Sequence, residues 1–427
     1  MLSVGVLVDL KWGPEAGGQV KCWERFAEAA EAFRNEIDLT VHFQGDGPKA
    51  YMLSENVRFV VLPPALSTSR FRSMDGVADH TDLAPFHPRL LPYLKQYDVI
   101  HTTDAFFAMA KTALIARRLH GIPLVTSIHT DTPKYTKIYS AHIIRNITQN
   151  GALGRLLLDR FHLDDVFSSF MSRKLERFAK RCRWIFVSKD EDLRHMARLF
   201  PGKGVSFLRR GIDTKRFHPR LRDRHRLQEA FGIAEDRFVV IFAGRVDQGK
   251  NVMTLARAAR LLLDQDEHIH VLFVGEGAQK SAIGRLLGDS VTLPGVVHHS
   301  TLGWLYASSD ALAFPSRIEV CPNVVLEARA SGLPVLVPAE GGAAQLVKNN
   351  GQDGVLVPLD LPQTWAAEIR NLIHDRDRSK RMGEAARKIM KSQWPTWKEV
   401  FEKDLAPVWR RVASFFGKPP RGYGRRP

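Results

Sequence analysis

Short apolar runs and longer amphipathic stretches alternate along most of the chain. A continuous apolar run of about four to eight residues is typical of a parallel strand buried on both faces, whereas apolar residues three or four positions apart predict a helix. The first half is predicted to contain strands at Val4–Val8, Leu39–Phe43, Val57–Leu62, Val99–His101, Leu124–Ile128 and Trp184–Val187, and helices that begin near Lys21, Phe106 and Met171. Further apolar runs in the second half lie at Val239, Val271, Leu312, Val335 and Val355.

This repeated order of strand and helix predicts two α/β domains, each with a parallel sheet and right-handed crossovers. The tripeptide Gly-Ile-Pro at 121–123 is matched by Gly-Leu-Pro at 332–334, and both predict a turn from a helix into a strand. The charged stretch 201–237 is predicted to cross between the domains. We therefore expect a first domain over 1–205 and a second over 206–396.

The composition of the 427-residue chain is that of a folded protein, with 44% hydrophobic and 25% charged residues. Its three cysteines, Cys22, Cys182 and Cys321, are odd in number and far apart, which argues against a disulfide framework and for a reducing compartment. The N-terminus is predicted to form a first strand and not a signal peptide, because it lacks the basic start and the cleavage site of a signal peptide. No apolar run approaches the ~18 residues of a membrane-spanning helix. We expect a cytoplasmic protein, or one attached peripherally to the inner face of the cytoplasmic membrane.

The formal net charge of +16 is distributed unevenly. Eleven basic and four acidic residues lie between Lys134 and Arg183, where bulky apolar residues also recur at helical spacing. Such a region is typical of a surface for anionic lipid, but it equally fits a core-facing helix pair with solvated cations. The C-terminus is also basic, and residues 417–427 are predicted to be disordered. Nucleic acid is not an expected partner, because no zinc-finger spacing, aromatic RNA-binding signature or basic region before heptads is present.

The strand predicted at Val239 runs into a loop with two cations. This loop begins at Gly244 and carries Arg245, Gly249 and Lys250 before an amphipathic helix. Open α/β sheets bind ligands at the carboxyl ends of their strands, and glycine permits close backbone approach. A diphosphate is the ligand that two cations at this position would suit.

Two glutamates eight positions apart, Glu319 and Glu327, follow the strand predicted at Leu312. Pro322 is predicted to be the first residue of a helix, which places Glu319 at the helix mouth and Glu327 about two turns further on. The free N–H groups of the helix start would bind phosphate, and the carboxylates would accept hydrogen bonds from sugar hydroxyls. Together with the cationic loop, this pattern favours a nucleotide sugar as ligand.

These segments resemble the retaining glycosyltransferases of family 4, also described as glycosyl transferases group 1. The resemblance covers nearly the whole chain, and its ordered motifs are Gly17-Gly18, Ser-Ile-His-Thr-Asp-Thr-Pro (127–133), Arg-Gly-Ile-Asp-Thr-Lys-Arg-Phe-His-Pro (210–219), the Gly-Arg…Lys loop, Val-Gly-Glu-Gly (274–277), the E-x7-E segment and Gly341-Gly342. It implies the GT-B fold, in which two Rossmann-like domains face each other across a central cleft. The first would bind the acceptor and be completed by a C-terminal helix, about 397–416, that crosses back to it. The second would bind the donor.

The resemblance also implies a role for each matched residue. Arg245 and Lys250 would hold the donor diphosphate, Glu319 would contact the transferred sugar, and Glu327 would accept hydrogen bonds from the ribose. His129 would lie beside the donor sugar and phosphate, so that His129, Arg245, Lys250 and Glu319 are the expected catalytic residues. The remaining donor-binding positions are expected to be Gly17, Gly18, Gly244, Val297, Val320, Cys321, Pro322 and Asn323.

Two departures from the family pattern bear on the donor. Val320, Cys321 and Pro322 stand where many relatives have an aromatic residue followed by glycine, and Ala344-Gln345 replaces a frequent Pro-Glu. Both changes affect the expected sugar contacts more than the class of reaction. The adjacent pair His298-His299 is assigned to a loop, since neighbouring side chains point apart in most backbones.

The implied reaction is transfer of a sugar from a nucleotide-diphosphate sugar to a hydroxyl acceptor with retention at the anomeric carbon, without a metal or other cofactor. UDP is the first candidate for the nucleotide and GDP the second. The basic amphipathic region favours a membrane lipid, or a lipid-linked or cell-envelope glycan, as acceptor. Two alternatives stay open: an inactive GT-B scaffold at the membrane surface, and a GT-B nucleotide-sugar epimerase or phosphorylase.

Overall fold

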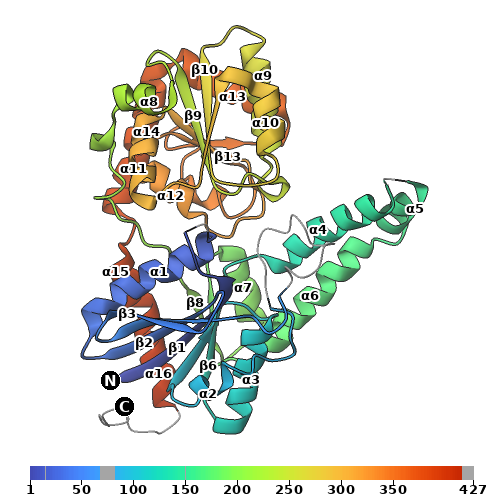
Figure 1. Cartoon of the computed structure of the whole chain (residues 1–427), viewed down its shortest axis with the longest axis vertical. Helices are drawn as coiled ribbons and strands as arrows, with labels where there is room; N and C mark the ends of the chain where they lie inside the picture. Colours follow the sequence, from blue (N-terminus) through green and yellow to red (C-terminus); the bar gives the residue numbers. More distant parts are fainter. Residues whose placement is uncertain (15, 68–81, 150, 416–427) are drawn as a thin grey trace.

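The computed structural model describes residues 1–14, 16–67, 82–149 and 151–415 of the chain. It consists of two α/β lobes that lie one above the other in Figure 1, each built on its own sheet. The prediction of two α/β domains with parallel sheets is therefore confirmed. The tail predicted at 417–427 lies outside the described residues.

The first lobe is built on an eight-stranded sheet with the order β3-β4-β2-β1-β5-β6-β7-β8. All neighbouring strands are parallel except β3 and β4, which are antiparallel. The six strands predicted for this half are all present. The full set is β1 (Leu2–Lys11), β2 (Ile37–Gln44), β3 (Lys49–Ser54), β4 (Val57–Leu62), β5 (Val99–Thr102), β6 (Leu124–Ser127), β7 (Trp184–Val187) and β8 (Gly204–Phe207).

Strands β3 and β8 are absent from the prediction because both lie at sheet edges, where a strand needs no continuous apolar run. β3 is largely exposed and β8 is half-buried. The position of β8 corrects the expected crossing at 201–237 and the expected boundary at 205, because Gly204–Phe207 pairs with β7 in the first sheet. The chain leaves the first sheet only after Phe207.

The helices of the first lobe divide into those that cover the sheet and those that project from it. Helices α4, α5 and α6 form an arm that extends away from the body of the lobe, with α5 at its far end (Figure 1). We call residues 132–179 the arm. The helices are α1 (Gly18–Ala30), α2 (Leu91–Leu94), α3 (Ala108–His120), α4 (Thr132–Ile147), α5 (Ala152–Arg155), α6 (Leu163–Ala179) and α7 (Asp190–Leu199).

The second lobe contains a six-stranded sheet with the order β11-β10-β9-β12-β13-β14, all parallel. Numbered within the lobe, this order is 3-2-1-4-5-6, and the direction of winding changes between β9 and β12, where such folds bind ligands. The strands are β9 (Phe238–Ala243), β10 (Ile269–Val274), β11 (Val291–Gly295), β12 (Ala311–Ala313), β13 (Val335–Pro338) and β14 (Val355–Val357). The helices are α8 (Arg224–Phe231), α9 (Val252–Leu263), α10 (Lys280–Leu287), α11 (His299–Ser308), α12 (Asn323–Ala330), α13 (Pro362–His374) and α14 (Arg376–Ser392).

The C-terminal helices return to the first lobe (Figure 1). Helix α15 (Trp397–Val400) continues through a wide turn into α16 (Ala406–Ser414). Phe401 and Trp409 are fully buried in the same hydrophobic cluster as Val4 on β1 and Trp23 on α1. Burial of such large aromatic side chains holds the C-terminal segment on the first lobe.

The two segments that connect the lobes lie against each other. The backbone N–H of Ile212 donates to the carbonyl of Pro395, and the indole of Trp394 donates to the carbonyl of Arg210. A Cβ placed on Gly211 would lie 2.4 Å from the backbone of Trp397, so only glycine permits this contact. The connection between the lobes is therefore a packed pair of segments.

The structure shows which apolar residues of the arm pack against the core and which are exposed. Near the body of the lobe, Met171 and Leu175 pack against the core, as a core-facing helix pair requires. Many large apolar side chains elsewhere on the arm are exposed: Ile138, Ile147, Leu153, Leu156, Phe161, Val166, Phe167 and Phe170. Within the described residues, no helix combines the length and the apolar character needed to span a membrane.

Candidate functional site

The loop after β9 and the loop after β12 meet at the point where the second sheet changes its direction of winding. The ammonium group of Lys250 forms an ion pair with the Glu319 carboxylate, which also accepts a hydrogen bond of 2.8 Å from Ser316. Asp247 organises the first loop, because its carboxylate accepts from Arg245 Nε at 3.0 Å and from the backbone N–H of Lys250 at 3.1 Å. The structure thus brings Arg245, Lys250 and Glu319 together, three of the four charged residues predicted for the site of the second lobe.

Burial and mutual attraction act in opposite directions on this ion pair. Burial favours the neutral form of Lys250, but the charge of Glu319 outweighs it, and the pKa of Lys250 lies above its ordinary value. Burial likewise acts to raise the pKa of Glu319, but the charge of Lys250 prevails and holds that pKa below its ordinary value. Both groups therefore stay charged through the neutral range.

The Glu319 loop is supported from behind by the glycine pair Gly341-Gly342. A Cβ on Gly342 would lie 1.9 Å from the carbonyl oxygen of Val320, so a side chain there would displace the loop. The N–H of Gly342 donates to the carbonyl of Glu319 at 3.0 Å. This backbone contact explains why the paired glycines follow β13.

Helix α12 connects the two glutamates, with one correction to the prediction. Pro322 has an extended ψ of 117° and is the N-cap, so the helix begins at Asn323 and not at Pro322. The free N–H groups of a helix point toward its N-terminal end. Those in the first turn of α12 therefore face the Glu319 loop, an arrangement suited to an anion. Glu327 lies in the same helix and is 7% exposed.

Glu327 has two partners from α11. Its Oε1 lies 3.2 Å from Nε2 of His299, and its Oε2 lies 3.5 Å from the hydroxyl of Tyr306. The expectation that His298 and His299 belong to a loop is wrong for His299, which is the first residue of α11. His298 is the N-cap of that helix and accepts from the backbone N–H of Ser300.

The first lobe covers the cationic loop with aromatic side chains. Tyr135 and Tyr139 on α4 stack with ring centroids 5.5 Å apart, and the Tyr135 hydroxyl lies 3.3 Å from a guanidinium nitrogen of Arg245. A Cβ on Gly249 would lie 2.8 Å from the hydroxyl of Tyr139. The base of the arm therefore lies directly against the loop that holds Arg245 and Lys250.

His129 lies in a separate cluster, in the loop after β6. Its Nδ1 accepts a 2.8 Å hydrogen bond from Arg210, and its Nε2 lies 2.7 Å from Ser127 Oγ and 3.3 Å from the Trp23 indole nitrogen. Burial lowers the pKa of His129 well below its ordinary value, and the neighbouring Arg210 acts in the same direction. His129 is thus a neutral, internally bonded histidine, and its ring does not bond to the Lys250–Glu319 pair.

Arg210 is a buried cation next to this histidine. Its guanidinium donates to His129 and, at 3.0 Å, to the sulfur of Cys22. Burial raises the pKa of the Cys22 thiol to about 11 and that of Cys321 to about 11, and the charge of Arg210 opposes both changes. Thiols that remain protonated are poor nucleophiles, so neither cysteine is suited to nucleophilic chemistry.

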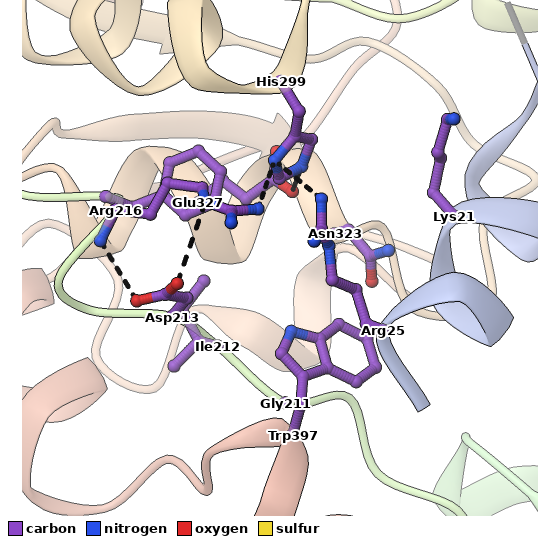
Figure 2. A pocket seen from close by; sticks show the side chains of 11 residues that line it. Lys21, Arg25, Gly211, Ile212, Asp213, Arg216, His299, Asn323, Glu327 and Trp397 are labelled. Carbon is purple, nitrogen blue, oxygen red and sulfur yellow. Dashed lines mark hydrogen bonds and ion pairs between the residues drawn. The ribbon is translucent and has the colours of Figure 1, made fainter. Parts of the chain in front are cut away.

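Figure 2 shows a pocket between the lobes that contains Glu327. Lys21 and Arg25 on α1 line it from the first lobe, and His299 and Asn323 line it from the second lobe. The connecting segment contributes further lining residues: Gly211, Ile212, Asp213, Arg216 and Phe217. Helix α12 and helix α1 thus lie on opposite sides of one pocket.

The remaining predicted positions follow the ends of strands, on loops or at the start of a helix. Gly17 is the N-cap of α1 after β1, and a Cβ on Gly18 would meet no atom within 4 Å. Gly244 follows β9 with a φ of 143°. Val297 follows β11 and packs against the core of the second lobe. Within the described part of the chain, no group of three or more His, Cys, Asp or Glu side chains is placed to hold a metal ion.

Several residues of the site are absent from the sequence prediction. Tyr135 lies two positions after the Ser-Ile-His-Thr-Asp-Thr-Pro segment and Arg210 begins another of the family motifs, so the motif boundaries could have directed attention to both. Arg25 and His299 carry no such signal. Their contact depends on how the two lobes are placed, which the sequence pattern does not specify.

Two family models match consecutive parts of the chain. Residues 16–216 match the model described as Glycosyltransferase Family 4, and residues 223–389 match Glycosyl transferases group 1. Among curated proteins, sulfoquinovosyl transferase SQD2 of Arabidopsis thaliana is 25% identical over 330 residues, which cover 75% of this chain and 60% of the plant protein. D-inositol 3-phosphate glycosyltransferase 1 of Catenulispora acidiphila is 26% identical over 362 residues, which cover 82% of this chain and 80% of the bacterial protein.

The fold also matches solved structures along almost its whole length. The Anabaena protein HepE, crystallised in complex with UDP and glucose, superposes with a TM-score of 0.67 at 17% sequence identity. The match covers 96% of this chain and 99% of that protein. Both lobes and their connection are therefore arranged as in a known two-domain fold.

Proposed function

The chain belongs to family 4 of the glycosyltransferases and has their GT-B fold, and we propose that it transfers a sugar from a nucleotide-diphosphate sugar to a hydroxyl acceptor with retention at the anomeric carbon. The observation that carries this proposal is the convergence of Arg245, Lys250 and Glu319 at the carboxyl ends of β9 and β12. Two cations beside a helix N-terminus suit a diphosphate, and an adjacent carboxylate suits sugar hydroxyls.

In this reaction the bond between the anomeric carbon and the diphosphate oxygen breaks, and a bond to the acceptor oxygen forms on the same face. The acceptor proton passes to an oxygen of the departing phosphate. Arg245 and Lys250 would stabilise the negative charge that develops on the diphosphate, which is the largest single contribution expected from such a site. His129 is neutral and internally bonded, so we assign it a role in shaping the wall of the site.

We propose that the two cations take the place that a divalent metal has in other nucleotide-sugar enzymes. Transfer should then continue at an undiminished rate in EDTA. Loss of activity in EDTA, restored by magnesium or manganese, would show that a metal neutralises the leaving group. The assay is donor turnover by the same preparation before and after chelation.

The arm supports an acceptor at a membrane surface. It exposes Phe161 and Phe170 to the extent of 58% and 59%, and Arg145, Arg155 and Arg160 of the same arm are also exposed. Apolar side chains beside arginines suit the boundary between acyl chains and anionic head groups. The base of the arm touches the cationic loop through Tyr135, so a membrane-bound arm would bring a lipid or lipid-linked acceptor close to the donor.

A thermal-shift screen with UDP, GDP, ADP and their sugars tests the proposed donor class. One nucleotide series should raise the melting temperature, and its sugar should be consumed when an acceptor is supplied. A chain that binds none of them would contradict the proposal. Binding without any turnover of the donor would favour the inactive scaffold, and interconversion of the free nucleotide sugar would favour an epimerase.

A further inference from the structure

His299 connects the pocket between the lobes to the carboxylate of Glu327. One ring nitrogen, Nε2, lies 3.2 Å from Glu327 Oε1. The other, Nδ1, lies 3.2 Å from a guanidinium nitrogen of Arg25 on the first lobe and 3.3 Å from one of Arg216 on the connecting segment (Figure 2). The side chain of His299 in the second lobe thus contacts the first lobe, the connecting segment and Glu327, which is predicted to bind the ribose.

The partners of His299 define which nitrogen carries its proton. Guanidinium N–H groups only donate, so Nδ1 must accept from Arg25 or Arg216. A neutral imidazole then carries its proton on Nε2, and this N–H donates to the acceptor oxygen of Glu327. The arginines thereby orient the ring and present a donor to the carboxylate.

The contacts with His299 and Tyr306 limit the number of ligand hydroxyls from which Glu327 can accept hydrogen bonds. A carboxylate has about four lone-pair positions, and His299 and Tyr306 face one oxygen each. About two positions remain, which matches a pair of neighbouring hydroxyls. Asn323 lines the same pocket, and its buried Oδ1 has no hydrogen-bond partner among the described residues, so a further acceptor is present.

We propose that His299 is a positioning residue that orients Glu327 toward the 2′- and 3′-hydroxyls of the nucleotide, and that Arg25 links this contact to the first lobe. The inference rests on the proposed function only in taking a nucleoside diphosphate as ligand. It adds a residue that the family motifs do not contain and a physical connection between nucleotide recognition and the first lobe.

Calorimetric binding of UDP and of 2′,3′-dideoxy-UDP tests the positioning role, with GDP and dideoxy-GDP measured in parallel. In the unaltered chain the diol should strengthen binding by about tenfold or more, as expected for hydrogen bonds to a charged group. His299→Leu removes donor and acceptor together, and should bring the two affinities within about threefold. His299→Gln keeps an amide donor and acceptor, and should restore most of the preference for the diol.

The outcomes separate the inference from the proposed function. If the unaltered chain binds no nucleoside diphosphate, the proposed function fails. If it binds and prefers the diol, but folded His299→Leu keeps the same preference, the positioning role of His299 is overturned. A loss of preference that His299→Gln does not restore would also overturn it, because packing alone would then explain the effect.

A second comparison tests the link to the first lobe. Arg25→Met should change the affinity for UDP by less than about threefold, since the residues proposed to bind the nucleotide lie on the second lobe. It should lower the turnover of the nucleotide sugar by about tenfold. The double variant with His299→Leu should be no slower than His299→Leu alone, because both changes break one connection. Glu28→Gln is the control, since it removes the negative charge that pairs with Arg25 at 2.6 Å and leaves His299 in place. Additive losses in the double variant, or a loss of turnover in Glu28→Gln equal to that in Arg25→Met, would contradict the link.

Discussion

The second lobe and the arm of the first lobe differ in where their charged and apolar side chains find partners. In the second lobe Arg329 and Asp353 form a fully buried ion pair at 2.7 Å, and Lys250 is paired with Glu319. On the arm, large apolar side chains such as Phe170 lie in solvent. We infer that the second lobe is built to hold a small ligand inside its own framework, whereas the outer surface of the arm is built for a partner outside the chain.

The largest expected effect concerns the cationic loop of the second lobe. Lys250→Ala should lower kcat/KM for sugar transfer by about 10²–10³-fold, because it removes a charge that stabilises the departing diphosphate. The matched control is Lys388→Ala, which alters an exposed lysine of α14 and should leave transfer unchanged.

A double variant separates catalysis from stability at this position. Lys250→Ala leaves the Glu319 carboxylate half-buried without its cation, so unfolding should become easier. Adding Glu319→Gln should restore stability to chemical denaturation without restoring transfer. A double variant that regains both would show that the pair only supports the fold.

The buried ion pair of the second lobe should give the next largest effect. Arg329→Met removes the donor to Asp353 and should lower the free energy of unfolding by about 3–5 kcal/mol, since a buried charge loses its partner. Arg260→Met breaks an exposed pair with Asp264 and should lower the free energy of unfolding far less, because solvent screens that pair. Equal losses in the two variants, measured by urea denaturation, would contradict the difference between buried and exposed charges.

The sequence predicted the second lobe more completely than the first. Five of its six strands appear as apolar runs, and β9 and β10 are buried along their whole length, whereas the edge strand β11 is half-exposed and was not predicted. The charged residues of its site follow β9 and β12. Glu319 and Lys250 could be placed together because both are positioned by the carboxyl ends of parallel strands. The helix start was misplaced by one residue at Pro322, since proline is compatible with both the N-cap and the first helical position.

The parts that the sequence did not specify depend on edges and on contacts between the lobes. β3, β8 and β11 are edge strands without a continuous buried apolar run, and none of them was predicted. The contact of His299 with Arg25 joins residues 274 positions apart on different lobes, and no local pattern encodes it. The apolar spacing of the arm predicted helices, but identical spacing fits a buried face and an exposed one, so exposure of Phe170 had to come from the structure.

Acid should affect the first lobe more than the second. Burial lowers the pKa of His42 to about 3 and that of His101 to about 3, whereas an unfolded histidine titrates near 6.5. Below pH 6.5 the unfolded chain therefore binds protons that the folded lobe does not, and stability falls as the pH falls. Each histidine should contribute on the order of 1–2 kcal/mol between pH 6.5 and pH 5.

Hydrogen exchange at pH 6.5 and pH 5 measures this loss strand by strand. The opening free energy of β1 and β2 should fall over this range, and His42→Gln should reduce the fall. His225→Gln changes an exposed histidine and serves as the control. An equal fall in every strand of both lobes, unaffected by His42→Gln, would show that other groups control acid stability.

The smallest effect on stability is expected on the arm. Phe161→Ser with Phe170→Ser should change the free energy of unfolding by less than about 0.5 kcal/mol, because both side chains are already exposed. The same variant should bind anionic vesicles about tenfold more weakly at low salt, since it removes apolar area from the membrane contact. Leu119→Ser changes a residue of the first lobe that is 62% exposed, and it should not alter vesicle binding. If the unaltered chain fails to float with such vesicles, a soluble acceptor becomes the better proposal.

Calorimetric comparison of UDP with UMP, and of GDP with GMP, most directly tests whether Arg245 and Lys250 hold a diphosphate. The unaltered chain should bind the diphosphate of its preferred base at least about tenfold more tightly than the monophosphate. Lys250→Ala in the stabilised Glu319→Gln background should abolish most of that preference. A folded variant that retains the full preference would show that the diphosphate is held elsewhere.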